Sequence, residues 1–168
     1  MPLYTQLDSP LGRLTLVGEA SADAPGGTVL TALSVPEQKG GVVPAPDWAR
    51  EPAAFAEAER QLKEYFAGER REFGLTLVAR GTAFRERVWA ALDGVPYGET
   101  VSYGEIGRRI GASRPAVRAI GTAIGANPLL VLRPCHRVIG ADGSLTGYAG
   151  GLDRKRALLT LEGVAAVR

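Results

Sequence analysis

The first third of the chain alternates apolar and polar residues in the way that predicts strands. Residues 3–19 alternate on both sides of a turn at residues 9–12, which is typical of a β-hairpin. Residues 28–35 form a third segment of strand character, and residues 36–48 are rich in glycine and proline. We therefore expect a small antiparallel sheet followed by a long loop.

The spacing of apolar residues becomes helical over residues 51–69. Apolar side chains recur there every three or four positions, and the residues concerned are Phe55, Ala58, Leu62 and Phe66. Gly68 marks the expected end of the helix. Residues 75–78 are expected to be extended. No chemically reactive side chains gather in this part of the chain, so its predicted role is that of a scaffold.

From residue 82 onward the pattern predicts helices. Residues 82–95 place apolar side chains on one face, and a second helix starts near Ser102, where Glu105 three positions later has the spacing of a capping box. A third helix follows the turn at residues 111–113, with a buried face expected from Val117, Ile120 and Ile124. Two short helices joined by a glycine-containing turn predict a helix-turn-helix, although a plain helical hairpin shows the same pattern.

The rest of the chain is expected to close this second half. Residues 129–132 are predicted to be extended, and residues 138–145 to form a strand, a turn and a strand. Residues 152–163 predict a last helix with Leu152, Leu158 and Leu159 facing inward. The whole pattern predicts a mixed α/β (α+β) protein. Residues 1–80 would form a supporting domain with an antiparallel sheet, and residues 82–168 a mainly helical domain with the helix-turn-helix.

Composition limits the classes of protein to which the chain can belong. The 168 residues are 45% hydrophobic and 23% charged, which is ordinary for a soluble globular protein. No apolar run is long enough to cross a bilayer, and the first residues lack the pattern of a secretory signal. A single cysteine cannot form an intramolecular disulfide, which fits a reducing compartment. We expect a cytoplasmic protein that does not bind membranes.

Charge is unevenly distributed between the two predicted halves. Residues 1–80 hold 8 basic and 11 acidic residues, whereas residues 81–168 hold 12 basic and 7 acidic residues. Eleven of those 12 basic residues are arginines, which suit the recognition of phosphate groups. The alternative is a solvated, arginine-rich surface without a partner.

The chain holds one cysteine and one histidine, and the two are neighbours in "RPCHRVIG", residues 133–140. A thiol must lose its proton to act as a nucleophile, so Cys135 needs a base or a positive neighbour. In an extended segment, adjacent side chains point to opposite faces, so His136 can serve Cys135 only if the backbone turns or a water bridges them. The alternative is a buried structural cysteine beside a surface histidine. One cysteine and one histidine cannot build a Cys/His zinc site, and we expect neither metal nor cofactor.

The predicted second helix of the helix-turn-helix has a slim outer surface. Apart from two arginines it carries small residues, and the set is Arg114, Arg118, Gly121, Thr122 and Gly125. A glycine inside a helix costs about 1 kcal/mol relative to alanine, so a close approach to something else is expected to offset that cost. This surface indicates contact with a partner or with another helix.

The string "PCHRV" closely resembles the signature of the O6-alkylguanine-DNA alkyltransferase family. It occurs here in the family's order with "SYGEI", "RAIG", "GANP" and "GYAGG", so that the resemblance runs from Thr82 to Glu162. The resemblance implies direct repair of O6-alkylguanine, and of O4-alkylthymine, in double-stranded DNA. It also implies base flipping, irreversible transfer of the alkyl group to Cys135, a single turnover, no cofactor, and a monomer without an obligate protein partner.

The resemblance also implies roles for single residues in the reaction. Cys135 matches the acceptor thiol, and His136 matches the histidine that takes the thiol proton through a bound water. Glu162 matches the acid that orients this histidine. Asn127 matches the asparagine that braces the turn before the acceptor segment, and Tyr148 matches the tyrosine that donates to the guanine ring.

Further matches concern the DNA and the pocket for the base. Tyr103 matches the tyrosine that crowds the phosphate beside the target nucleotide, and Arg118 matches the arginine that fills the vacated place in the base stack. Around these two, the DNA-binding residues are expected to include Arg114, Gly121 and Thr122, and the substrate-binding residues to include Val138, Ala149 and Gly150. Ala149 stands where some members have a serine whose hydroxyl reaches the guanine oxygen, so the preference among alkyl groups stays open. The zinc found in some relatives has no ligands here.

Two other functions are compatible with the same residues. The chain could bind damaged bases without repairing them, although relatives of that type carry tryptophan at the acceptor position. A transcriptional regulator that places its helix-turn-helix in the major groove would instead show strong sequence preference and form a dimer.

Overall fold

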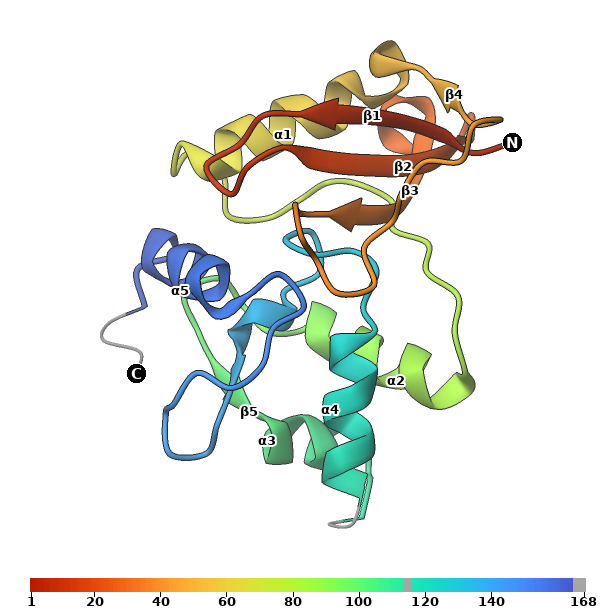
Figure 1. The fold of residues 1–168 in the computed structure, drawn as a ribbon. Coiled ribbons are helices and arrows are strands. Elements are labelled where there is room, and N and C mark those ends of the chain that lie inside the picture. Colours follow the sequence, from red (N-terminus) through yellow and green to blue (C-terminus); the bar gives the residue numbers. More distant parts are fainter. Residues whose placement is uncertain (114–115, 165–168) are drawn as a thin grey trace.

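The computed structural model describes residues 1–113 and 116–164. A sheet with one α-helix beside it forms the upper part of the molecule in Figure 1, and the other α-helices form the lower part. The four-stranded sheet has the order β3-β2-β1-β4. The predicted fold class, an antiparallel sheet at the N-terminus followed by a helical half, is confirmed.

The predicted hairpin consists of β1 (Leu3–Leu7) and β2 (Leu14–Ala20), which pair antiparallel. The predicted third strand is β3 (Thr28–Ser34), preceded by the 3-10 turn η1 (Pro25–Gly27) and paired antiparallel with β2. The loop at residues 36–48 leads into β4 (Ala49–Arg50), which pairs parallel with β1. Sequence analysis missed β4 because a strand of two residues has no periodicity to detect.

The helix predicted over residues 51–69 is shorter in the structure. A 3-10 turn, η2 (Pro52–Phe55), leads into α1 (Ala56–Phe66), and Gly68 follows with a φ of 78°. That φ lies in the left-handed region that glycine adopts without strain, so Gly68 ends the helix as expected. The buried side chains of α1 include Leu62 and Tyr65, which join the apolar core formed by the strands.

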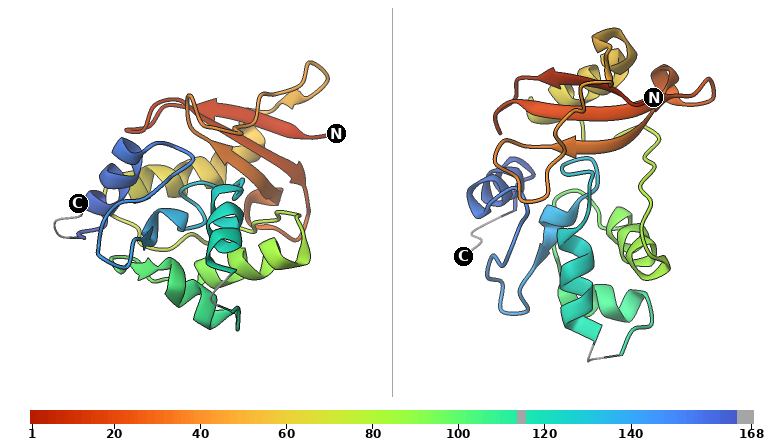
Figure 2. Two further views of the ribbon diagram at one scale, coloured as in Figure 1. Left: turned by 60° about the horizontal axis from the view of Figure 1, so that its bottom comes forward. Right: turned by 45° about the vertical axis from the view of Figure 1, so that its right-hand side comes forward.

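Three helices pack together in the second half of the chain (Figures 1 and 2). They are α2 (Ala83–Asp93), α3 (Tyr103–Arg109) and α4 (Val117–Gly125). The Ser102 hydroxyl accepts a hydrogen bond from the Glu105 backbone N–H at 3.1 Å, which is half of the predicted capping box. The Glu105 carboxylate pairs with arginines of its own helix instead of returning to Ser102. The predicted helix-turn-helix corresponds to α3 and α4.

Two predictions of inward-facing residues were wrong. Val117 is 44% exposed, whereas Ile120 and Ile124 of the same helix are buried, because the first turn of α4 lies at the outer end of the molecule (Figure 1). Leu152 is 43% exposed at the start of α5 (Leu152–Leu161), the last helix. Both residues stand at the first position of their helix, and their side chains lie outside the contacts that bury Ile120 and Lys155 three residues later.

The segments between α4 and α5 turn more sharply than predicted. Residues 129–132 are not extended throughout, since Val131 has a φ of 70° and reverses the chain before the acceptor segment. The 3-10 turn η4 (Cys135–Arg137) then leads into β6 (Val138–Ile139). β6 pairs parallel with β5 (Val101–Ser102), so the predicted strand–turn–strand is wrong in its second strand.

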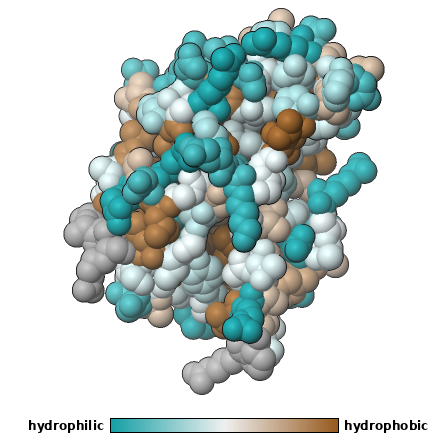
Figure 3. Space-filling model, viewed as in Figure 1, coloured by the Kyte–Doolittle hydropathy of each residue, from teal (hydrophilic) through white to brown (hydrophobic). Residues whose placement is uncertain are grey.

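The two halves of the chain share one apolar core. The Leu33 backbone of β3 exchanges hydrogen bonds with the segment after α4, through Pro128 O at 2.9 Å and Leu130 N at 3.3 Å. The division into domains at residues 1–80 and 82–168 stays a prediction. Within the described ranges, no helix combines the length and apolar character needed to cross a membrane. On the face shown in Figure 3, hydrophilic side chains surround separate hydrophobic patches.

Candidate active site

The backbone turns at the neighbouring cysteine and histidine. Cys135 and His136 lie in the 3-10 turn η4, in which the Arg137 N–H bonds to Pro134 O at 3.0 Å. Both side chains are buried, with exposed fractions of 3% and 0%. The alternative of a surface histidine is therefore wrong. The backbone turns at these two residues, which is the condition under which His136 can serve Cys135.

A buried carboxylate holds the histidine. Glu162 follows directly after α5, and its Oε2 atom lies 2.8 Å from His136 Nε2. Arg137 also donates to this carboxylate, from Nε to Oε1 at 2.7 Å and from Nη2 to Oε2 at 2.9 Å. The Tyr65 hydroxyl donates to Oε2 at 2.6 Å. Four side chains from three distant parts of the sequence thus form one buried polar cluster.

This cluster fixes the protonation of the imidazole. Burial alone would raise the pKa of Glu162, but the hydrogen bonds from His136 and Arg137 lower it to about 2, so the carboxylate is ionised. An ionised carboxylate can only accept, which places the proton of neutral His136 on Nε2 and the lone pair on Nδ1. Burial lowers the pKa of His136, against the opposing effect of Glu162. The Nδ1 atom is buried and has no partner among the described residues, so it is available to accept a proton.

The thiol of Cys135 is held in its protonated form. Burial raises its pKa to about 11, although a hydrogen bond from Asn127 Nδ2 to Sγ at 3.2 Å acts in the opposite direction. Asn127 also bonds to both backbone groups of Leu129, which braces the turn after α4 as expected. A thiol of this kind reacts only when a base takes its proton during the reaction.

A cavity of about 570 Å³ opens beside Cys135. Its lining includes Cys135, Tyr148 and Ala149 on one side and the α4 residues Gly121, Thr122 and Gly125 on another. The hydroxyl of Tyr148 is buried with no partner among residues 1–113 and 116–164. A buried hydroxyl of this kind has an unused capacity to donate a hydrogen bond.

Two of the expected substrate-binding residues lie behind the cavity wall. Gly150 is buried, and a Cβ atom there would come within 2.8 Å of the Tyr148 ring. The absence of a side chain at Gly150 therefore leaves room for this ring. Val138 is buried in β6, and its carbonyl oxygen accepts from Lys155 Nζ at 2.6 Å. Neither residue lines the cavity that contains Cys135.

Three of the expected DNA-binding residues, Tyr103, Gly121 and Thr122, line this cavity. Arg118 and Thr122 are exposed on α4, and the Arg118 side chain has no hydrogen bond or ion pair with any described residue. The Tyr103 hydroxyl donates to Thr146 O at 3.1 Å, and its ring lies close to Gly121. Arg114 lies outside the described residues.

The structure adds four residues that sequence reasoning missed. Tyr65 and Arg137 bind Glu162, while Lys39, from the loop at residues 36–48, lines the cavity. Lys155 is buried in α5 and donates to three carbonyl oxygens of residues 138–147, and burial lowers its pKa to about 8. The spacing of Tyr65 and Lys155 marked them only as helical positions, and a lysine in a helix normally faces water.

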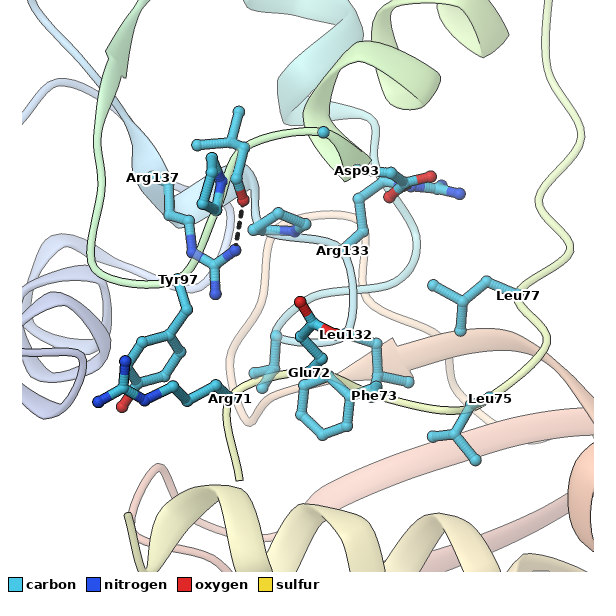
Figure 4. Close-up of a pocket in the computed structure, with 15 residues that line it drawn as sticks. Arg71, Glu72, Phe73, Leu75, Leu77, Asp93, Tyr97, Leu132, Arg133 and Arg137 are labelled. Carbon is cyan, nitrogen blue, oxygen red and sulfur yellow. Dashed lines mark hydrogen bonds and ion pairs between the residues drawn. The ribbon is translucent and has the colours of Figure 1, made fainter. Parts of the chain in front are cut away.

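Behind the acceptor segment lies a second cavity of about 540 Å³ (Figure 4). Arg133 and Arg137 both line it, and each is occupied: Arg133 Nε bonds to Asp93 at 3.1 Å, and Arg137 Nη1 bonds to Val95 O at 2.6 Å. Arg137 therefore connects the wall of this cavity to the Glu162 carboxylate.

Comparison with protein-family models gives two matches. The model described as "6-O-methylguanine DNA methyltransferase, DNA binding domain" matches residues 83–164, and the model described as "6-O-methylguanine DNA methyltransferase, ribonuclease-like domain" matches residues 3–79. Together they extend over nearly the whole chain.

Similar proteins are found among bacteria and archaea. A methylated-DNA–protein-cysteine methyltransferase of Mycobacterium bovis is 53% identical over 160 residues, which are 95% of this chain and 91% of the relative. The protein of the same name from Methanosarcina acetivorans is 44% identical over 95% of this chain and 97% of its own. The crystal structure of Mycobacterium tuberculosis OGT in complex with DNA superposes with a TM-score of 0.85 at 52% identity, covering 95% of this chain and 92% of that one.

Proposed function

Because this chain belongs to the O6-methylguanine-DNA methyltransferase family, we propose that it repairs alkylated DNA by moving the alkyl group from guanine O6 to the sulfur of Cys135. The observation that carries this proposal is the placement of one buried thiol beside a cavity and next to a His136–Glu162 pair. The chain is a methylated-DNA–protein-cysteine methyltransferase in this proposal, and double-stranded DNA with alkylated bases is its partner.

The chemical step is a displacement at the alkyl carbon. The proton of the Cys135 thiol passes through a bridging water to His136 Nδ1, and Glu162 stabilises the imidazolium that results. The sulfur then forms a bond to the alkyl carbon, and the bond from that carbon to O6 breaks with its electron pair going to the base. The Tyr148 hydroxyl donates to the guanine ring and stabilises this charge. The base takes up one proton, which balances the proton lost by the thiol, so the products are unmodified guanine and a thioether.

The thioether explains why one cysteine is sufficient and no cofactor is required. A thioether is stable to water, so the sulfur does not return to the thiol and each molecule acts once. The same chemistry applies to O4-alkylthymine, in which an alkyl group is also bound to an exocyclic ring oxygen.

Reaching Cys135 requires the base to leave the duplex. The cavity beside the thiol supports this step, since its wall includes Gly121 of α4 and the ring of Tyr103. The slim, exposed surface of α4 enters the minor groove, Tyr103 crowds the neighbouring phosphate, and Arg118 fills the vacated place in the base stack. An inserted side chain recovers part of the unstacking cost of a few kcal/mol. The protein acts as a monomer made of the two predicted domains.

Transfer of radiolabel tests the proposal. Duplex DNA carrying a labelled methyl group on guanine O6 should pass its label to the protein, with at most one labelled residue per molecule, and peptide mapping should find it on Cys135. The Cys135→Ala variant should bind the same DNA and take no label. Binding of the damaged duplex by the unaltered chain without any transfer would show a damage sensor and not an alkyltransferase.

A further inference from the structure

The N-terminal half contributes one side chain to the polar cluster around His136. Tyr65 lies near the end of α1, 97 positions before Glu162, and its hydroxyl donates to Glu162 Oε2 at 2.6 Å. The Tyr65 side chain is fully buried. Its ring is held by aromatic neighbours, with centroid distances of 5.2 Å to Phe73 and 6.3 Å to Tyr97. The hydroxyl therefore has one fixed position.

The hydrogen bonds of Glu162 show what this hydroxyl can and cannot do. Arg137 binds both carboxylate oxygens through Nε and Nη2, and this two-point contact already fixes the plane of the carboxylate. Tyr65 is therefore not needed to orient it. However, Tyr65 and His136 both bind Oε2, at 2.6 and 2.8 Å, so they share the electron density of one oxygen.

Sharing one acceptor makes the two hydrogen bonds compete. When His136 is neutral, the carboxylate charge is available to the Tyr65 hydroxyl, and that hydrogen bond is strong. When His136 gains a proton, the charge is drawn toward the imidazolium and the bond from Tyr65 weakens. Tyr65 thus favours the neutral form of His136 over the protonated form.

Other charged and titratable groups face the same cluster from each packed element. Cys135 and Arg137 belong to η4, Lys155 to α5, Tyr97 to the segment after α2, and Tyr148 to the loop before α5. Arg137 and Lys155 both lower the basicity of His136 by their positive charge. Tyr65 differs from them because it acts through an uncharged donor, so its hydroxyl can be removed without changing the formal charge of the site.

We propose that Tyr65 is a positioning residue for alkyl transfer, which shares Glu162 Oε2 with His136 and so limits how strongly this carboxylate draws a proton onto the imidazole. The first half of the chain then influences the basicity of His136 through Glu162, beyond its predicted role as a scaffold. This inference rests on the proposed function, in which His136 receives the proton of Cys135.

The test compares Tyr65→Phe with Tyr97→Phe. Both variants lose one phenolic hydroxyl, but the Tyr97 hydroxyl donates to Leu161 O at 3.3 Å and not to Glu162. The chain has a single histidine, so the imidazole signals in nitrogen-15 NMR spectra belong to His136 without further assignment. The Nε2 proton resonance reports the strength of the hydrogen bond to Glu162 at any one pH.

In Tyr65→Phe, the Nε2 proton resonance should move downfield because His136 no longer shares its acceptor oxygen. The basicity of His136 should rise by about tenfold, the change expected when part of a hydrogen bond to a charged group is lost. The rate of methyl transfer from duplex DNA should increase by up to about tenfold at pH 7 and should converge with the unaltered rate at acid pH, where the ring is protonated in both. Tyr97→Phe should change neither the resonance nor the pH profile.

An unchanged Nε2 resonance and pH profile in Tyr65→Phe, with only a lower melting temperature, would overturn the proposal and leave Tyr65 a purely structural role. A rate reduced by the same factor at every pH would do the same. Failure of the proposed function is a separate result, because it would appear as absence of methyl transfer in the unaltered chain, while the NMR comparison would still report on Tyr65.

Discussion

Replacing Glu162 by glutamine is expected to destabilise the fold by several kcal/mol as well as to slow alkyl transfer. The carboxylate is 4% exposed and accepts from His136, Arg137 and Tyr65. Glutamine keeps the size of the side chain but removes its charge, which leaves the Arg137 guanidinium buried without a counter-ion. Breaking a buried pair in this way costs about 3–5 kcal/mol.

The lowered pKa of Glu162 indicates a stabilisation of similar size. The pKa is lowered from 4.5 to about 2, and a shift of this size corresponds to about 3 kcal/mol. Because the pKa is lower in the folded than in the unfolded chain, this stability is fully present above pH 4.5 and is lost as the pH falls toward 2. The difference between the unaltered chain and Glu162→Gln should therefore be largest near pH 7 and should shrink steadily below pH 4.5.

Thermal and urea unfolding followed by circular dichroism measure both effects. For a chain of this size, a loss of about 3–5 kcal/mol lowers the melting temperature by about 10 °C. Glu105→Gln is a suitable control, since Glu105 forms only partly exposed pairs with Arg108 and Arg109, and its replacement should have a much smaller effect on stability. If Glu162→Gln matched the control in stability at pH 7, or kept its full deficit at pH 3, the buried ion pair would not have the energetic role assigned to it.

Three further outcomes can be checked with single variants or with the unaltered chain. Near neutral pH, iodoacetamide should alkylate Cys135, the only cysteine, about a hundredfold more slowly than a thiol of ordinary pKa, because the pKa of Cys135 is raised from 9.0 to about 11. A rate equal to that of free cysteine would contradict this. Arg118→Ala should slow repair of duplex DNA far more than reaction with a free O6-alkylguanine base, since only the duplex requires flipping; equal loss on both substrates would remove that role. Gly150→Ala should slow reaction with both substrates by on the order of tenfold to a hundredfold, because its Cβ would displace the Tyr148 ring, and the same clash should lower the melting temperature by a few degrees. An unchanged rate would show that the ring position is not critical.

Much of the fold was predictable because local periodicity and caps specify it. The strands β1 and β3 and the helices α1 to α5 lie within ranges that the apolar spacing indicated, and β2 extends one residue beyond its range. The errors fall where no local signal exists. A strand of two residues, β4, has no period. Val117 and Leu152 have helical spacing, but each stands at the first position of its helix with an exposed side chain.

The order of residue types along the chain was enough to indicate which chemistry is possible here. The sequence supplies one thiol and one imidazole in adjacent positions, a cysteine count too low for a disulfide, and a motif order that indicates the family. These are properties of residue type and order along the chain, so they do not depend on how the chain folds.

Which groups control that chemistry follows from the way the chain packs. This packing brings Tyr65 of α1 and His136 onto the same carboxylate oxygen of Glu162, and it buries Lys155 among carbonyl oxygens of the segment before its own helix. Contacts between residues nearly a hundred positions apart leave no trace in local spacing. The pKa values of these groups depend on burial and on partners, and both exist only after the two halves of the chain have packed into one core.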